Sequence, residues 1–330
     1  MTVLPSAPAV ARLPGLPEAV TVFEVGPRDG LQSESSTVPT AVKLELCRRL
    51  IAAGVPAIEA TSFVPPGWIP QLTDAEAVMA GLDTPIDTPV YALVTNERGL
   101  DRAQSAGVRS ISVVVSATES FAAANLNATR ETALARATAL VARAGRAGLE
   151  TRGYVSMSFG DPWEGAVPPT AAAEMGAELA AAGCERIVLS DTTGVATPGA
   201  IAAVVAGLNA AGVSPGFLAL HLHDTYALAA ANVVEGLRNG VHEFDSAAGG
   251  LGRCPYAPGA AGNLATEDLV WLLNGLGIQT GVNLDAVIDT TAWLAESLGS
   301  TPASRVARAV LRQRAASTAT THNEFLERTQ

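Results

Sequence analysis

The sequence has few cysteines, no long hydrophobic run and no excess of positive charge, and each absence argues against a class of protein. The three cysteines are odd in number and lie far apart, so we do not expect a disulfide scaffold. No apolar run approaches the roughly 18 residues that a membrane span requires. The net charge of −11 argues against nucleic acid or an anionic membrane as the main partner. We therefore expect a cytoplasmic protein with no nucleic-acid or membrane partner.

The chain is long and apolar enough for one large domain, because 48% of its 330 residues are hydrophobic. Residues 1–17 contain four prolines and one arginine, which resembles neither a signal peptide nor an Arg-rich transit peptide. We expect these residues to form a flexible N-terminal arm. Residues 18–298 are then expected to form the catalytic domain, followed at 299–330 by a C-terminal helix and a polar tail that frays from about residue 315.

Strand-like and helix-like segments alternate eight times along the chain. The expected strands cover residues 19–26, 57–63, 89–94, 110–116, 150–159, 186–194, 217–224 and 243–250. The expected helices cover residues 39–53, 71–81, 96–106, 127–147, 170–182, 198–211, 227–239 and 266–274, with one or two more in 284–313. The strands are short and almost continuously apolar, as strands buried on both faces are.

Eight such units predict an α/β fold, the TIM (β/α)8 barrel, with extra C-terminal helices and a Gly-rich lid loop. The alternative is an open, doubly wound sheet, which binds dinucleotides through a G-x-G-x-x-G turn. No such motif follows the first expected strand, so the barrel is favoured.

Two of the four histidines stand together in the strand FLALHLHD, as His221 and His223. Residues two apart on a strand point to the same side, with Cα atoms roughly 7 Å apart. Two imidazoles on one rigid face form half of a metal site. The alternative is a pair of buried, hydrogen-bonded histidines with no ligand.

Polar residues gather where the expected strands end, which is the active-site end of a TIM barrel. They are Arg28 and Asp29 after the first strand, Glu59 and Ser62 in the second, Asp191 and Thr192 at the sixth, and Cys254 and Asn263 in the loop after the eighth. A chance scatter of polar residues would fall at both ends of the strands. The pattern therefore indicates an active site.

The dipeptide Arg28-Asp29 adds a cation and a carboxylate to this end. Asp29 would complete a metal site with two histidines, whereas alone it is also typical of a surface turn. Arg28 would stabilise an enolate or carboxylate oxygen as charge develops. Glu59 lies in an apolar strand and needs a partner, for which Arg28 is the candidate. A purely structural ion pair between them is the alternative.

The segment 249–268 is rich in glycine and is typical of a mobile lid. Cys254 lies on it and would donate a proton or guard the site, unless it is a free thiol without a role. Asn263 would add an oxygen ligand to a hard cation, or else cap the following helix. Oxygen and imidazole ligands suit Mg²⁺ or Mn²⁺ better than structural Zn²⁺. Two histidines and a carboxylate also hold iron in non-haem oxygenases, on folds unlike the one expected here.

Four motifs together resemble the hydroxymethylglutaryl-CoA lyase family over roughly residues 19–298. They are R-D-G-L-Q (28–32), I-E-A-T-S-F-V (58–64), H-L-H-D-T-Y (221–226) and G-L-G-R-C-P-Y-A-P-G-A-A-G-N-L-A-T-E-D-L (250–269). The last motif is the most specific. Related Claisen synthases typically read R-D-G-E-Q, whereas this chain has Leu31.

The resemblance implies a divalent cation, Mg²⁺ or Mn²⁺, and a set of site residues. The metal ligands would be Asp29, His221, His223 and Asn263; the catalytic residues Arg28, Glu59, Asp191, His221 and Cys254; and the substrate-binding residues Arg28, Gln32, Ser62 and Thr192. The implied substrate is an acyl-CoA, and a homodimer is the assembly that the resemblance suggests.

The implied reaction is the retro-Claisen cleavage of 3-hydroxy-3-methylglutaryl-CoA to acetyl-CoA and acetoacetate. Ser35 stands where close relatives often carry lysine, and 159–165 reads F-G-D-P-W-E-G where Cys-Pro is expected. A related lyase with a different acyl group is therefore one alternative. A Claisen synthase that joins acetyl-CoA to a 2-oxo acid is another, and a non-catalytic acyl-CoA or metal sensor is a third.

Overall fold

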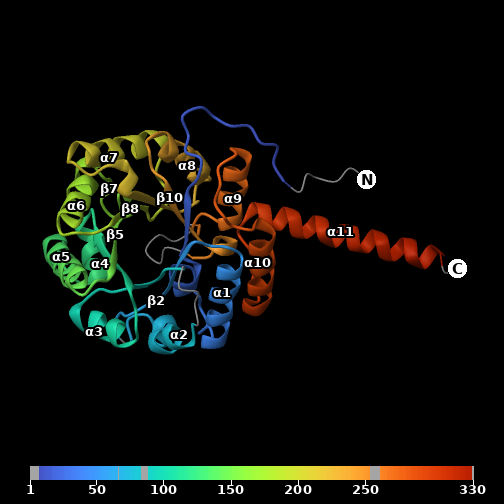
Figure 1. Ribbon diagram of the computed structural model, residues 1–330, viewed down its shortest axis with the longest axis horizontal. Coiled ribbons are helices and arrows are strands. Elements are labelled where there is room, and N and C mark those ends of the chain that lie inside the picture. The colour runs from blue at the N-terminus through green and yellow to red at the C-terminus, as the bar shows by residue number, and fades with distance from the viewer. Residues whose placement is uncertain (1–6, 66, 83–87, 253–260, 329–330) are drawn as a thin grey trace.

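Eight parallel strands close into a barrel surrounded by helices in the computed structural model (Figure 1). The structure describes residues 7–65, 67–82, 88–252 and 261–328, and beyond residue 316 it describes the backbone alone. The strand order around the barrel is β1-β10-β9-β8-β5-β4-β3-β2. The TIM-barrel prediction is confirmed.

The barrel strands follow the apolar runs of the sequence. They are β1 Thr21–Glu24, β2 Ala57–Ser62, β3 Val90–Leu93, β4 Ser110–Ser116, β5 Glu150–Ser156, β8 Arg186–Asp191, β9 Leu218–Leu222 and β10 Glu243–Ser246. Side chains alternate between two cores, as the period of two in a strand requires. In β4, Ile111 and Val113 pack outward among the helices, whereas Val114 packs with Tyr154 in the barrel.

Each expected helix is present and packs its apolar side on the barrel. These helices are α1 Thr40–Ala52, α2 Ala75–Gly81, α3 Glu97–Ser105, α5 Arg130–Arg146, α6 Pro169–Ala181, α7 Pro198–Ala210, α8 Ala229–Arg238 and α9 Thr266–Gly275. Helix α1 ends before Gly54, whose φ of 84° is a left-handed conformation that favours glycine. The strands and helices lie within a few residues of their expected bounds.

Several short elements were not expected from the sequence. Helix α4, Glu119–Leu126, lies between β4 and α5, and the short strands β6, Gly160–Asp161, and β7, Gly165–Ala166, form a small hairpin. The turn after β1 is a π-helical turn over Gly26–Gly30. Segments this short carry too few residues for a periodic pattern to appear.

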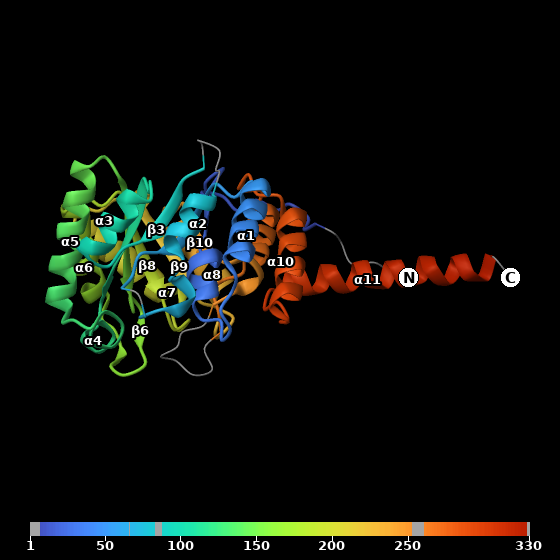
Figure 2. The ribbon, with the colours of Figure 1, turned by 90° about the horizontal axis from the view of Figure 1, so that it is seen from below.

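The C-terminal region forms two helices, α10 Leu284–Leu298 and α11 Arg305–Arg328. Helix α11 projects away from the barrel in both ribbon views (Figures 1 and 2). The helix continues to Arg328, past residue 315 where the sequence predicted that the chain begins to fray. The fraying itself stays a prediction. That segment contains neither glycine nor proline, the two residues that most oppose a helix.

Residues 7–17 of the N-terminal arm form a turn but no helix or strand. The arm contacts the barrel domain through the Ala11 N–H, which donates to the Gly275 carbonyl at 2.8 Å. The division into arm, catalytic domain and C-terminal segment stays a prediction. Among the helices that the structure describes, none combines the length and apolar character needed to cross a membrane.

Candidate metal centre and active site

The π-helical turn after β1 carries Arg28 and Asp29 into the mouth of the barrel. The Val25 carbonyl accepts hydrogen bonds from the N–H groups of Asp29, at 2.8 Å, and Gly30, at 3.2 Å. The buried Glu24 carboxylate fixes the start of the turn by accepting from the Gly26 N–H at 2.8 Å. A Cβ on Gly26 would lie 2.5 Å from Glu24 Oε1, so any larger residue there would displace the carboxylate from this hydrogen bond.

Asp29, His221 and His223 form a cluster able to hold a metal ion. One ligand atom from each lies within 4.8 Å of the others, and His221 Nε2 is 4.0 Å from Asp29 Oδ2. Both histidines are buried, with 6% and 4% of their surface exposed. The turn after β1 and the end of β9 thus bring together the three ligands expected from the sequence.

The amide of Asn263 lies against this cluster. Its Nδ2 donates to Asp29 Oδ2 and to the Leu251 carbonyl, both at 2.9 Å. Its Oδ1 is buried and has no hydrogen-bond partner among the described residues, which is costly unless another ligand satisfies it. Helix α9 has Ala265, not Asn263, as its N-cap. The donor set therefore fits a hard divalent cation.

Arg28, in the turn after β1, and Glu59 of β2 form a buried ion pair. Arg28 also donates to Asp29 Oδ1 at 2.8 Å, and its guanidinium lies 5.8 Å from the Tyr154 ring centre. Burial acts to lower the pKa of Arg28, but the charges of Glu59 and Asp29 raise it above its ordinary value. Arg28 is therefore a permanent cation beside the cluster of candidate metal ligands.

The same charges keep Asp29 ionised. Burial acts to raise the pKa of Asp29, but Arg28 and the two histidines lower it to about 2. An ionised carboxylate is the form that binds a metal.

The two histidines differ in their hydrogen-bond partners. His223 Nδ1 lies 3.2 Å from the Ala261 carbonyl, and a carbonyl only accepts, so Nδ1 carries the proton and Nε2 is free as a ligand. Burial and the nearby His221 lower the pKa of His223 to about 4. His223 is therefore neutral at pH 7.

His221 is held by a carboxylate that the sequence interpretation missed, Asp245 of β10. His221 Nδ1 lies 3.1 Å from Asp245 Oδ2. Burial lowers the pKa of His221, but the hydrogen bond to Asp245 and its charge raise it above the ordinary value. Asp245 is itself paired with the buried Arg152, which also pairs with Glu243.

A signal for this network was present in the sequence. Arg152, Glu243 and Asp245 are charged residues inside strands expected to be buried, as Glu59 is. A charge in such a strand needs a partner. The parallel register of β9 and β10, which sets Asp245 opposite His221, comes only from the structure.

The remaining expected site residues are divided between the pocket and its surroundings. Gln32 and Thr192 line the same pocket as Arg28 and the metal cluster. Ser62 does not, and its hydroxyl donates to the Leu93 carbonyl at 3.2 Å. Asp191 is buried behind the pocket and accepts from the N–H groups of Val195 and Ala196, at 2.9 and 3.0 Å. Burial raises the pKa of Asp191 to about 6. Cys254 lies outside the described residues.

The pocket has two unlike sides. The ends of β1 and β9 contribute the charged and imidazole groups. The opposite side is largely apolar and is formed by Val64, Trp68, Ile69, Leu93, Val114, Phe121 and Leu126. The pocket can therefore hold a small polar group against a cation while an apolar part faces the other wall.

Comparison with known proteins places the chain among lyases. The family model described as HMGL-like matches residues 19–294. A cytoplasmic 3-hydroxy-3-methylglutaryl-CoA lyase of Rattus norvegicus is 41% identical over 311 residues, covering 94% of this chain and 90% of the relative. A mitochondrial hydroxymethylglutaryl-CoA lyase of Mus musculus is 45% identical over 296 residues, covering 89% of this chain and 90% of the relative.

Solved structures agree with the sequence relatives. The hydroxymethylglutaryl-CoA lyase of Pseudomonas aeruginosa has a TM-score of 0.87 at 39% identity, covering 91% of this chain and 99% of the other. An HMG-CoA lyase from Acinetobacter baumannii, solved with coenzyme A and 3-methylmalate, has a TM-score of 0.84 at 37% identity, covering 88% of this chain and 95% of the other.

Proposed function

This chain belongs to the HMGL-like family, and we propose that it cleaves 3-hydroxy-3-methylglutaryl-CoA into acetyl-CoA and acetoacetate with a divalent cation. Lyases of this name match the chain over nine-tenths of its length. The observation that carries the proposal is the cluster of three candidate metal ligands, Asp29, His221 and His223, which lies beside the buried cation Arg28. Retro-Claisen cleavage would use both, because negative charge develops first on the C3 hydroxyl oxygen and then on the enolate of the thioester fragment.

The cation would be held by Asp29, His221, His223 and Asn263. Two observations support this set: the clustered ligand atoms and the unpartnered Asn263 Oδ1. A divalent cation bound there would act as a Lewis acid, lowering the pKa of a hydroxyl and orienting it. Mg²⁺ and Mn²⁺ suit the mixed oxygen and imidazole donors.

Arg28 would stabilise the enolate of acetyl-CoA. After the C3 hydroxyl loses its proton, the C2–C3 bond breaks, C3 becomes a ketone carbon, and the electron pair moves onto C2 and the thioester oxygen. Arg28 is ionised and fixed by Glu59, so it needs no rearrangement to hold that charge. Glu59 is then a positioning residue for Arg28.

The other expected residues would bind or position the substrate. Gln32 and Thr192 line the pocket and would donate to oxygens of the acyl-CoA. Asp191 holds the backbone of Val195 and Ala196 and would act by positioning the loop that carries Thr192. Ser62 does not line the pocket, so it would affect the reaction only by holding β2 against β3 through its hydrogen bond to the Leu93 carbonyl. Asp29 and the two histidines are the candidates for the group that would take the hydroxyl proton.

Cys254 would return a proton to the enolate carbon as general acid. This role rests on its position in the Gly-rich segment of residues 249–268, whose described ends adjoin the metal cluster. The Asn263 N–H donates to the Leu251 carbonyl at 3.3 Å and the Asp224 N–H donates to the Gly262 carbonyl at 3.1 Å. Both ends of the segment are thus anchored at the mouth of the barrel.

The cellular setting is proposed from the relatives. Rat and mouse relatives are named both cytoplasmic and mitochondrial, and we propose the cytoplasm for this chain. Its partner would be the acyl-CoA substrate, and a homodimer its assembly.

The decisive experiment mixes purified, metal-stripped protein with 3-hydroxy-3-methylglutaryl-CoA and measures acetoacetate with and without Mg²⁺ or Mn²⁺. We expect acetoacetate only when the metal is added. If Mn²⁺ binds but no acetoacetate forms, the substrate assignment is wrong. If no metal binds, the assignment of the histidine cluster is wrong as well.

A further inference from the structure

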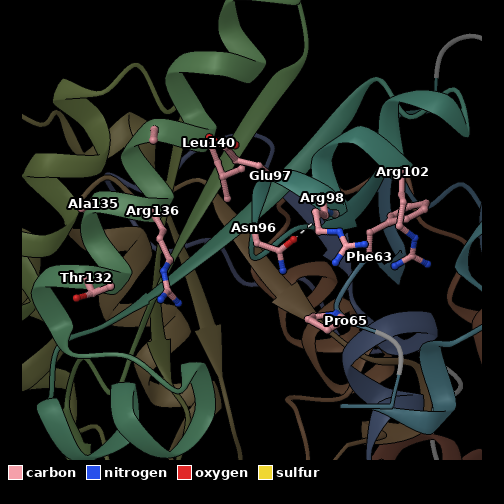
Figure 3. A pocket seen from close by; sticks show the side chains of 12 residues that line it. Phe63, Pro65, Asn96, Glu97, Arg98, Arg102, Thr132, Ala135, Arg136 and Leu140 are labelled. Atoms are coloured by element: carbon pink, nitrogen blue, oxygen red, sulfur yellow. Dashed lines mark hydrogen bonds between the residues drawn. The ribbon is translucent and has the colours of Figure 1, made fainter.

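Helices α3 and α5 are neighbours on the outside of the barrel, but they do not close on each other. Farther round the ring, α6 and α7 pack so tightly that a Cβ added to Gly207 would lie 3.2 Å from Ala173. Between α3 and α5 there is instead a groove of about 740 Å³ (Figure 3). Sites that bind small molecules enclose about 300–1,000 Å³, so the groove is large enough for one.

The α5 side of the groove is formed by Thr132, Ala135, Arg136, Ala139 and Leu140. Their spacing of three and four residues places them on one face of the helix. The first four are exposed, and all of these except Arg136 have small side chains, which leave the groove open. These four side chains therefore contribute little to holding α5 on the barrel.

The floor of the groove is apolar. It is formed by Phe63 and Pro65, which follow β2, and by Leu140 of α5. Phe63 and Leu140 both belong to the hydrophobic core, so the core itself reaches the floor of the groove. From Thr132 to Leu140 the helix rises about 12 Å, the length of an extended chain of about ten atoms.

Three guanidinium groups line the groove, from Arg98 and Arg102 on the α3 side and from Arg136 on the α5 side (Figure 3). Arg102 is already paired, since it donates to both oxygens of Glu76, at 2.7 and 3.0 Å. Arg98 and Arg136 have no side-chain ion pair or hydrogen bond among the residues that the structure describes. Glu97 supplies the one carboxylate among the described lining residues. The groove is therefore positively charged, although the chain as a whole carries −11.

An apolar floor between two unpaired arginines suits a ligand with one anionic head and an apolar body. A carboxylate accepts paired hydrogen bonds from a guanidinium, which presents its donors in a fixed planar fork. An unbranched apolar chain would cover Phe63, Leu140 and the two alanines and displace water from them. A small polar anion would leave this floor exposed to water, and a plain hydrocarbon would make no use of the guanidinium groups.

We propose that the groove between α3 and α5 binds an amphipathic carboxylate with a chain of about ten carbons. The carboxylate would lie between Arg98 and Arg136, and the chain would lie along α5 over Phe63 and Leu140. None of the α5 residues that line the groove also lines the pocket at the cluster of candidate metal ligands. The site is therefore separate from the proposed active site, and its occupancy does not depend on the proposed lyase activity.

Calorimetric titration of the purified chain with decanoate tests the proposal, and we expect a single decanoate to bind each chain. Hexanoate, which lacks four of the CH₂ groups, should bind at least about tenfold more weakly, since each buried CH₂ contributes roughly fourfold. Decan-1-ol, which lacks the charge, should also bind at least about tenfold more weakly. Failure of decanoate to bind, or equal binding of either analogue, would overturn the inference.

A double substitution tests the arginines. Arg98→Gln/Arg136→Gln should weaken decanoate binding at least about fivefold. The matched control, Arg146→Gln/Arg308→Gln, removes two exposed arginines that do not line the groove and should leave the affinity unchanged. Both pairs change the net charge equally, so an equal loss in the two would show a long-range effect of charge and would refute the site.

A further substitution fills the groove. Ala139→Trp places a large ring on a residue that lines the groove but not the pocket at the candidate metal ligands, so decanoate binding should fall at least about tenfold. The matched control is Ala203→Trp, at an exposed position of α7, which should bind decanoate as wild type does. Circular dichroism verifies that both variants fold.

Unchanged binding in Ala139→Trp would mean that decanoate binds elsewhere, and it would overturn the inference. The binding assay contains no thioester. Lack of lyase activity in the wild-type chain would therefore overturn the proposed function alone, and loss of the groove site would leave the proposed function intact.

Discussion

The two sides of the barrel mouth are held together by different interactions. On the side of β1, β9 and β10, charged groups are buried and each is fixed by an opposite charge or a hydrogen bond, as Arg28 is by Glu59. On the side of β3, β4 and α4, the wall is a set of apolar side chains around open space. On the first side, electrostatic partners fix the positions of the functional side chains. On the second side, only the shape of the apolar wall determines which substrate group fits.

The difference predicts how each side responds to change. A buried ion that loses its partner pays the cost of desolvation, so single substitutions on the charged side should have large effects. An apolar wall loses or gains contact area, and its substitutions should alter which acyl chain fits more than the rate of bond cleavage.

The largest effect is expected at Arg28. Arg28→Gln removes the cation that would hold the enolate, and kcat should fall at least about a hundredfold while Mn²⁺ still binds by calorimetry. The matched control is Arg186→Gln, which removes an arginine paired with Glu243 at the opposite end of the barrel. A loss below about tenfold in Arg28→Gln, which is about 1.4 kcal/mol of barrier, would contradict the enolate role.

Cys254 should show a smaller effect on the same reaction. Cys254→Ser replaces a thiol by a weaker acid, and we expect the rate to fall about tenfold to a hundredfold without loss of metal binding. Steady-state acetoacetate formation measures it, with the buried Cys184→Ser as the control. An unchanged rate would show that Cys254 is a free thiol without a catalytic role.

Asp245 lies on the charged side but contacts the candidate metal site only through its hydrogen bond to His221. Asp245→Asn keeps the shape of the side chain but removes the charge that orients the imidazole, and Mn²⁺ affinity should fall about ten- to a hundredfold. Glu243→Gln is matched to it, since Glu243 also pairs with Arg152 but Asp245 alone of the two contacts His221. Equal losses of affinity in both variants would mean that only the pairing with Arg152 matters.

The smallest effect concerns stability and pH at Glu24. Burial raises the pKa of Glu24 to about 7 from 4.5, so the folded state binds more protons than the unfolded state between these values. The contribution of Glu24 to the free energy of unfolding is therefore fully present below about pH 4.5 and is lost as the pH rises through about 7.

Glu24→Gln removes that titration. The free energy of unfolding of wild type should fall between pH 5 and pH 8 by roughly 1 to 3 kcal/mol more than that of the variant. Urea midpoints at both pH values measure the difference, with the exposed Glu174→Gln of α6 as control. Parallel pH dependences in wild type and Glu24→Gln would show that Glu24 does not titrate in this range.

The sequence predicted the barrel and the clustering of three candidate metal ligands because both depend on local pattern. Apolar runs alternating with helical segments indicate the fold, and the carboxyl ends of parallel strands must meet at one face. Asp29, His221 and His223 could therefore be grouped from the order of residues alone, and they do cluster. The pairing of Glu59 with Arg28 followed from the cost of a lone buried carboxylate, and it is confirmed.

Other features depended on register and on short elements. Asp245 meets His221 because β10 and β9 pair in one particular register, and no local pattern specifies that. Helix α4 contributes Phe121 and Leu126 to the apolar wall, yet so short a helix gives little periodic signal. Ser62 was expected at the site from its place at a strand end, but the direction of its side chain depends on the twist and pairing of β2.

The sequence by itself determined the class of fold, the donor types available for a metal and the end of the barrel at which they gather. Those follow from hydrophobic period and residue chemistry, which are local properties. The tertiary structure alone decided which imidazole nitrogen faces the cluster, which carboxylate fixes it, and how far the apolar wall extends past Leu126. These depend on contacts between residues far apart in the chain, and such contacts exist only once the barrel has closed.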